Sequence, residues 1–269
     1  MEDLKVILSE AFGEPSDSDP EDEFSEWKIS SMGGGGGSIF FGSNWSWERI
    51  TEVNGLWVCN DFLSLDQQSS LLSAIQAEGW FTEESHNQAM RFGNLPEWAV
   101  ELSNSIRQAI LFCGGSDSCV PDVPLTTNSG NDKELISLFP PDLLWREPLF
   151  DQLIANVYQP GEGIRAHVDL MKFEDGIAIV SLESSCVMHF GRAESEDVYS
   201  LAEDDSSGKV PVLLNPGSLA LMWGEARYLW KHEINRKQQT AGGFQEWQGR
   251  VITQKRRTSV TLRKLCLPD

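Results

Sequence analysis

The 269-residue sequence contains no apolar run of about 18 residues, the length that a membrane-spanning helix requires. Its start, Met1 to Leu4, has neither a basic nor an apolar stretch, so we expect no secretory signal and no membrane association. The five cysteines are an odd number without Cys-x-x-Cys spacing, which indicates reduced thiols rather than a disulfide framework or a zinc site. We therefore expect the protein in the nucleus and/or the cytoplasm.

Basic residues are few: 21 lysines and arginines stand against 41 aspartates and glutamates, a net charge of −20. Such a charge, if evenly spread, repels phosphate backbones. Here it is uneven, because residues 1–28 hold ten acids and two lysines, whereas residues 227–264 hold ten bases and two acids. The basic segment either contacts nucleic acid or forms a solvated face that balances the acidic body. The residues on which the first interpretation depends are Arg236, Lys237, Trp247, Arg250, Lys255 and Arg256.

The N-terminal part differs in composition from the rest of the chain. Residues 1–28 are acidic and contain serine and proline, and Gly33–Gly37 is an unbroken glycine run. This composition is typical of a disordered tail followed by a flexible linker. We expect a disordered tail and glycine-rich linker over residues 1–44 and one folded domain over residues 45–269. A short helix over Leu4–Phe12 would let the acidic tail bind a protein partner.

Two helices are expected in the first half of the folded domain. Leu56–Cys59 is a short apolar strand, and Ser64–Glu78 follows as a helix that Gly79 ends. A second helix begins at Pro96, shows apolar residues at helical spacing and ends at Gly114. Residues 114–133 are rich in Gly, Ser, Asp, Pro and Asn and are expected to form a loop.

After residue 151 short apolar or β-branched runs alternate with turn residues, which is typical of a β-sandwich or barrel. Helices followed by many strands predict an α+β fold, a jelly roll core with the N-terminal helices packed outside. The expected strands are Leu153–Tyr158, Ile164–Val168, Ile177–Leu182, Cys186–Phe190, Val210–Leu214, Ser218–Trp223, Ala226–Trp230 and Thr258–Leu265.

Two of the four histidines belong to a pattern that can bind a metal ion. His167 and Asp169 lie two residues apart, so on a strand their side chains share a face. Together with one distant histidine they would form the two-histidine, one-carboxylate triad of non-haem Fe(II) oxygenases. His232, on a later predicted strand, is the candidate third ligand. Taken alone, a His-x-Asp triplet is more often an ordinary surface or core pair.

The last predicted strand alternates between two kinds of residue. Arg257, Ser259, Thr261 and Arg263 fall on one face, and the apolar residues fall on the other. The strand is either half-exposed with its apolar side inward, or its arginine face lines the interior and pairs with an anionic ligand such as a small dicarboxylate.

Asn156 and Tyr158 share a face of an earlier strand. The turn sequence Gln159–Gly163 predicts a hairpin that brings both residues close to His167.

These stretches, in this order, resemble one family. NVYQPGEGIRAHVD resembles the N-x-Y-x-P-G-x-G-I-x-x-H-x-D pattern of the AlkB-like Fe(II)/2-oxoglutarate dioxygenases, and RTSVTLR resembles their R-x-[NS]-x-T-x-R. SLALMWGEARYLWKHEI and FEDGIAIVSLESSCVMHF resemble the segments around the last histidine and after the metal pattern, and GLWVCNDFLS and MRFG resemble the upstream region. The resemblance covers about residues 55–265.

The resemblance implies a double-stranded β-helix fold with Fe(II), 2-oxoglutarate and O2 as reaction partners. It implies that His167, Asp169 and His232 are the iron ligands and that Arg257 pairs with the distal carboxylate of 2-oxoglutarate. It further implies that the cosubstrate or the iron site is braced by Asn156, Tyr158, Ser259 and Arg263. In this family, decarboxylation of 2-oxoglutarate is coupled to hydroxylation of a C–H bond, and a hydroxylated N-methyl group leaves as formaldehyde.

The substrate is less constrained, because fold and cofactor do not determine it. The sequence resembles in particular the branch containing the tRNA wobble-uridine hydroxylase, but we expect neither the RNA-binding module nor the methyltransferase domain of that branch. A modified base in RNA or DNA, flipped into the pocket, is the favoured substrate. The alternatives are a protein side chain such as methyl-lysine, or a non-catalytic adaptor that retains the fold. His189 is expected to be structural, although a role in the substrate pocket is open.

Overall fold

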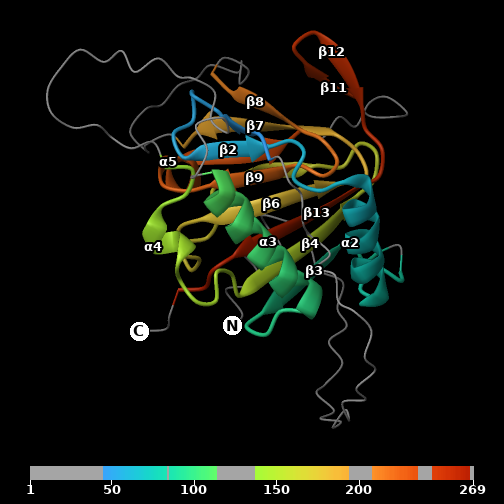
Figure 1. Ribbon diagram of the computed structural model, residues 1–269. Helices are drawn as coiled ribbons and strands as arrows, with labels where there is room; N and C mark the ends of the chain where they lie inside the picture. The colour runs from blue at the N-terminus through green and yellow to red at the C-terminus, as the bar shows by residue number, and fades with distance from the viewer. Residues whose placement is uncertain (1–44, 84, 114–136, 194–207, 236–243, 267–269) are drawn as a thin grey trace, which may run out of the picture.

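The computed structural model describes residues 45–83, 85–113, 137–193, 208–235 and 244–266 (Figure 1). The predicted tail and linker over residues 1–44 and the predicted loop over residues 114–133 lie outside these ranges. Within them, two antiparallel sheets and two long helices form the fold. The predicted α+β jelly roll with external helices is confirmed. No helix of the described part is long and apolar enough to cross a membrane.

The larger sheet of the described part has seven strands in the order β1-β2-β9-β6-β13-β4-β3. Its interior strand β13 pairs over its whole length with β4, and on its other side with β6. The sheet therefore joins segments that lie far apart in the sequence. Its strands are β1 (Trp47–Arg49), β2 (Leu56–Cys59), β3 (Gln88–Phe92), β4 (Gln152–Tyr158), β6 (Ile177–Leu182), β9 (Leu219–Met222) and β13 (Arg257–Arg263).

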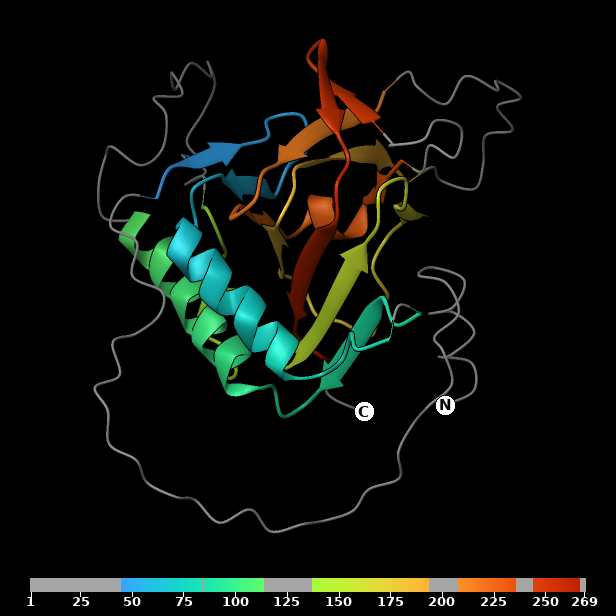
Figure 2. The same cartoon turned by 90° about the vertical axis from the view of Figure 1, so that its right-hand side faces the viewer.

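The smaller sheet has four described strands in the order β5-β10-β7-β8. Its inner face packs against the larger sheet through a buried apolar cluster that takes side chains from both. A separate hairpin, β11–β12, extends from the body of the sandwich (top of Figures 1 and 2). These strands are β5 (Ile164–His167), β7 (Cys186–Arg192), β8 (Val210–Leu214), β10 (Trp230–Ile234), β11 (Phe244–Trp247) and β12 (Arg250–Thr253).

Two helices, α2 (Leu65–Ala77) and α3 (Glu97–Cys113), cover the outer face of the larger sheet, and Figure 2 shows both on one side of the sandwich. A capping box starts α2: the Ser64 hydroxyl accepts a hydrogen bond from the backbone N–H of Gln67, whose side chain accepts one from the Ser64 N–H. The apolar faces of both helices and the outward residues of the sheet form a second buried cluster. The sandwich thus has one core between its sheets and another beneath its helices.

The short helices α4 (Pro141–Leu144) and α5 (Glu225–Tyr228) were not expected. The predicted strand Ala226–Trp230 is wrong, since α5 occupies its first part and β10 begins only at Trp230. Ala226 and Trp230 are both buried in the core between the sheets. Their spacing of four residues fits one helical turn, and short apolar runs do not distinguish a helix from a strand.

The predicted hairpin through Gln159–Gly163 is also wrong. Both edges of β4 are occupied, one by β3 and the other by β13, so β5 cannot pair with it. The chain instead crosses to the smaller sheet, where β5 pairs with β10. The turn still carries the chain from one wall of the interior to the other.

A side chain of the hairpin β11–β12 bonds to the smaller sheet. Pairing between β10 and β7 ends at Glu233 and His189, and no described strand pairs with the backbone of Val187 on that side. The buried Gln245 side chain takes that place: its Oε1 accepts from the Val187 N–H at 2.7 Å, and its Nε2 donates to the Val187 carbonyl at 3.0 Å. An amide side chain therefore completes the ladder where a strand is lacking.

Candidate active site

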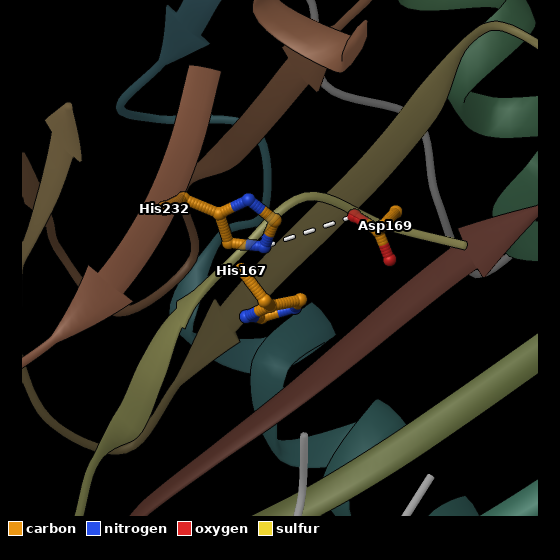
Figure 3. A group of neighbouring side chains, drawn as sticks. All are labelled: His167, Asp169 and His232. Atoms are coloured by element: carbon orange, nitrogen blue, oxygen red, sulfur yellow. Dashed lines mark ion pairs between the residues drawn. The ribbon is translucent and has the colours of Figure 1, made fainter. Parts of the chain in front are cut away.

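His167, Asp169 and His232 meet between the two sheets (Figure 3). His167 ends β5 and His232 lies directly opposite it on β10, with their ring centroids 4.3 Å apart. Asp169 follows β5, and its Oδ2 lies 3.7 Å from Nε2 of His232. One ligand atom from each residue falls within 4.8 Å of the others, so the three can hold a single metal ion.

The surroundings of the two histidines suit metal binding. The Nδ1 of His167 lies 2.8 Å from the Arg165 carbonyl oxygen. Because a carbonyl only accepts, Nδ1 carries the hydrogen and Nε2 is the basic nitrogen. Burial, followed by the neighbouring His167, lowers the pKa of His232 to about 3, which keeps this imidazole neutral.

Asp169 is ionised although it is buried. Burial works against the charged carboxylate, but Arg263 foremost and then His232 hold the pKa of Asp169 far below its usual value. Arg263 forms an ion pair with Oδ1 of Asp169 and donates a hydrogen bond to the Gln152 side chain at 3.2 Å. Two histidines and one carboxylate form the donor set of Fe(II) oxygenase sites, so these residues fit that metal.

A pocket adjoins the triad between the sheets. Its walls come from β4, β5, β6, β7, β10 and β13. Seven of the eight site residues expected from the sequence line it, and the eighth, Asp169, contacts two of them. The lining residues are Asn156, Tyr158, Ile164, His167, Ile179, Met188, His232, Arg257, Ser259, Thr261 and Arg263.

Arg257 gives this pocket a specific anion preference. Its side chain is 3% exposed, and its Nε donates to the Ser181 hydroxyl at 2.9 Å. Its two terminal nitrogens are buried and have no hydrogen-bond partner among the described residues. Because a buried guanidinium without partners is costly, these nitrogens indicate a carboxylate ligand that accepts two parallel hydrogen bonds.

Asn156 and Tyr158 lie on β4 beside Arg257 and Ser259 on β13, as the register Tyr158–Arg257 and Asn156–Ser259 requires. Burial raises the pKa of Tyr158 to about 12, so its hydroxyl stays protonated and can donate to an anion. The Asn156 side-chain oxygen accepts a hydrogen bond from Gln88 at 2.8 Å. The polar residues of both strands therefore point into the pocket, as the alternation predicted.

Several contacts of the site were missed in the sequence. Ser181 supports Arg257, Gln152 supports Arg263, and Gln88 supports Asn156. A polar residue inside the apolar run Ile177–Leu182 was the available signal for Ser181. Met188, and not its neighbour His189, lines the pocket.

Much of the basic segment does not reach the surface. Arg227, Arg257 and Arg263 are buried, and Lys264 forms an ion pair with Asp151 at 2.6 Å. Exposed bases of the segment include Lys231, Arg250, Lys255 and Arg256, the last of which pairs with Glu183. Arg236 and Lys237 lie outside the described residues. Much of the positive charge of this segment therefore lies in the interior of the protein rather than on its surface.

Comparisons with known proteins agree with this geometry. The 2OG-Fe(II) oxygenase superfamily matches residues 55–263. The tRNA (carboxymethyluridine(34)-5-O)-methyltransferase alkbh8 of Xenopus tropicalis is 30% identical over 227 residues, which cover 78% of this chain but 32% of the relative. The alkylated DNA repair protein ALKBH8 homolog of Arabidopsis thaliana is 27% identical, covering 79% of this chain and 59% of that protein. The chain thus spans about a third of the first relative and under two thirds of the second.

The solved structure of OsALKBH1 shares the fold, with a TM-score of 0.50 at 16% identity and coverage of 78% of this chain and 97% of that one. The family match shows that the chain belongs to the 2OG-Fe(II) oxygenase superfamily, whose cofactors are Fe(II) and 2-oxoglutarate, and the relatives support its resemblance to the AlkB-like dioxygenases.

Proposed function

We propose that this dioxygenase hydroxylates or oxidatively demethylates a modified base in RNA, with DNA as the nearest alternative. The observation that carries the proposal is the complete triad and anion pocket in a chain whose relatives are named for tRNA modification and for repair of alkylated DNA. When bound, Fe(II) and 2-oxoglutarate supply the oxidation of a C–H bond by O2. An intracellular nucleic-acid substrate agrees with the expected location in the nucleus and/or the cytoplasm.

The site residues divide the work in this proposal. His167, Asp169 and His232 hold the metal, and the free fork of Arg257 receives the distal carboxylate of 2-oxoglutarate. The protonated Tyr158 hydroxyl, with Asn156, Ser259 and Arg263, orients the cosubstrate or braces the ligands. The apolar parts of the pocket wall exclude water from the reacting atoms.

Edge strand β3 offers a surface on which a base could lie. Gln88 contacts the pocket residue Asn156, so the alternation of the strand turns Met90 and Phe92 to the same side. Phe92 is 45% exposed, and Met171 on the neighbouring loop is 72% exposed. Exposed apolar side chains beside a polar catalytic pocket suit the stacking of an unpaired base.

Lys172 adds a positive charge to this surface. Its Nζ lies 5.1 Å from the ring centroid of Phe92 and 5.1 Å from that of Phe173, and it forms no ion pair with a described acid. Burial, and then the cation Arg263, lower the pKa of Lys172, which an incoming phosphate would offset. We assign Lys172 to a phosphate of the bound nucleic acid.

The function is tested with anaerobically loaded enzyme offered bulk tRNA, single-stranded RNA and DNA carrying N-methylated bases, and a methyl-lysine peptide. The expected result is succinate formation stimulated by RNA, with an RNA product that has gained an oxygen atom or lost a methyl group. Turnover of the peptide alone would replace the proposal with the protein-directed alternative. If no nucleic acid stimulates succinate formation although 2-oxoglutarate binds, a nucleic-acid substrate has no support.

The role of Lys172 is tested by the salt dependence of RNA binding. Lys172→Gln should weaken binding uniformly across sequences and lower the slope of log K against log salt by about one, because one phosphate contact is lost. Lys231→Gln is the matched control, since this exposed lysine lies on the outer face of β10. Equal slopes for both variants and the wild type would exclude the phosphate contact.

A further inference from the structure

Arg227 is a buried cation that the site described so far does not use. It lies in α5, and its side chain is 0% exposed. Its guanidinium forms no ion pair with a described acid. It donates instead to backbone carbonyls: Nη1 to Asp169 at 2.8 Å, and Nη2 to Leu170 at 2.6 Å and to Phe173 at 3.2 Å. All three carbonyls belong to the loop that carries the metal ligand Asp169.

The same two segments are joined again a few residues away. The carboxylate of Asp175 accepts the backbone N–H of Gly224 with both oxygens, at 2.9 and 3.0 Å. The loop that bears Asp169 and the segment that leads into the strand of His232 are therefore fastened to each other at two points. Asp169 and His232 come from separate elements, but the same set of hydrogen bonds holds both segments.

The chemistry of the contact requires an arginine. A guanidinium presents five N–H donors in a rigid plane and can reach several carbonyls at once, whereas an ammonium is a compact point charge on a flexible stem. Burial of a cation is costly and persists only where other groups compensate it. Here carbonyl dipoles and the nearby charge of Asp169 provide that compensation.

We propose that Arg227 is a positioning residue of the metal centre. Arg263 holds the Asp169 carboxylate itself, and Arg227 holds the backbone from which that carboxylate extends. Both the carboxylate and the backbone of Asp169 are thus held in place without the metal. The inference rests on the proposed role of His167, Asp169 and His232 as ligands.

The test measures Mn(II) binding to the full, metal-free chain by the loss of the free-ion EPR signal. Arg227→Met should weaken Mn(II) binding by about 10- to 100-fold, the range for loss of a group that orients a ligand. Arg227→Lys keeps the charge and should recover part of the affinity, because one donor can still reach one carbonyl. The spectrum of bound Mn(II) should also broaden in both variants, as the ligand set becomes less uniform.

The chain provides a matched control in Arg146. This partly buried arginine also donates to three backbone carbonyls, those of Leu149, Asp175 and Gly176, at 2.9, 2.6 and 3.2 Å. None of them belongs to a ligand residue. Arg146→Met should therefore lower the unfolding temperature but weaken Mn(II) binding far less than Arg227→Met does, because Asp175 is the only residue of that set of hydrogen bonds that it reaches, when binding is measured well below the unfolding temperature.

Wild-type Mn(II) affinity in a folded Arg227→Met variant would overturn the proposal, as would equal losses in the Arg146 and Arg227 variants. If Arg227→Met does not fold, wild-type Mn(II) affinity in a folded Arg227→Lys variant would overturn the proposal in the same way. A wild-type chain that binds no Mn(II) would instead contradict the ligand assignment, so the two failures are distinguishable.

Discussion

The two sheets of the sandwich contribute different chemistry to one pocket. Every residue of β13 in the larger sheet is buried, with helices over its outer face, whereas the middle residues of β5 in the smaller sheet are exposed. The larger sheet supplies Arg257 and the other polar residues of the anion site, and the smaller sheet supplies both histidines. The buried charge of Arg257 thus lies in a fully buried strand, whereas the metal ligand His167 lies on an edge strand.

Removal of a ligand from the smaller sheet should have the largest effect. His167→Ala leaves two of three ligands, so turnover measured as succinate formation should be abolished. The fold should persist, because His167 ends an edge strand and is only partly buried. Circular dichroism and the unfolding temperature check that point. Full activity in a folded His167→Ala protein would refute the metal assignment.

Removal of the anion contact from the larger sheet should weaken 2-oxoglutarate binding without weakening metal binding. Arg257→Met takes away one partner of a buried charge pair, which typically costs about 2–5 kcal/mol, or about 30-fold to several thousandfold in the dissociation constant of 2-oxoglutarate. Mn(II) binding should change little, because Arg257 does not contact the triad. Isothermal titration of both ligands measures the difference, with Arg256→Met, a change at the exposed neighbour, as control. Parallel loss of both affinities would contradict the division between sheets.

Binding of both the metal ion and 2-oxoglutarate should stabilise the wild-type protein. A ligand at 100 times its dissociation constant adds about 2.7 kcal/mol, which corresponds to about 5–10 °C for a domain of this size. Anaerobic thermal unfolding with Mn(II) and 2-oxoglutarate should show this shift, and either one alone should give less. No shift with both present would favour the adaptor interpretation of the fold.

The smallest effect is expected on the outer face of the smaller sheet. His189 is opposite Glu233 in the ladder and turns away from the pocket that Met188 lines. Burial lowers the pKa of His189, which keeps it neutral near pH 7. His189→Gln should therefore change kcat/KM by less than about twofold, as surface substitutions usually do. A tenfold loss would place His189 in substrate binding after all.

The alternation of β13 could be predicted because its two faces meet different environments: Val260 and Leu262 face the helices, and Arg257 and Arg263 face the pocket. The triad could be predicted from spacing and residue type. The pairing of β4 could not, because it depends on β3, whose residues Gln88–Phe92 include no β-branched side chain. Arg227 was missed because its partners are carbonyls, which every residue carries.

The amide of Gln245 has a consequence for how this fold can vary. Because that side chain completes the ladder at Val187, these hydrogen bonds do not themselves require a fixed length of chain between Ile234 and Phe244. The entropic penalty of a longer connection grows only slowly with length. Insertions at this point should therefore be tolerated, and related sequences could acquire new recognition elements there without disturbing the metal ligand two residues before Ile234.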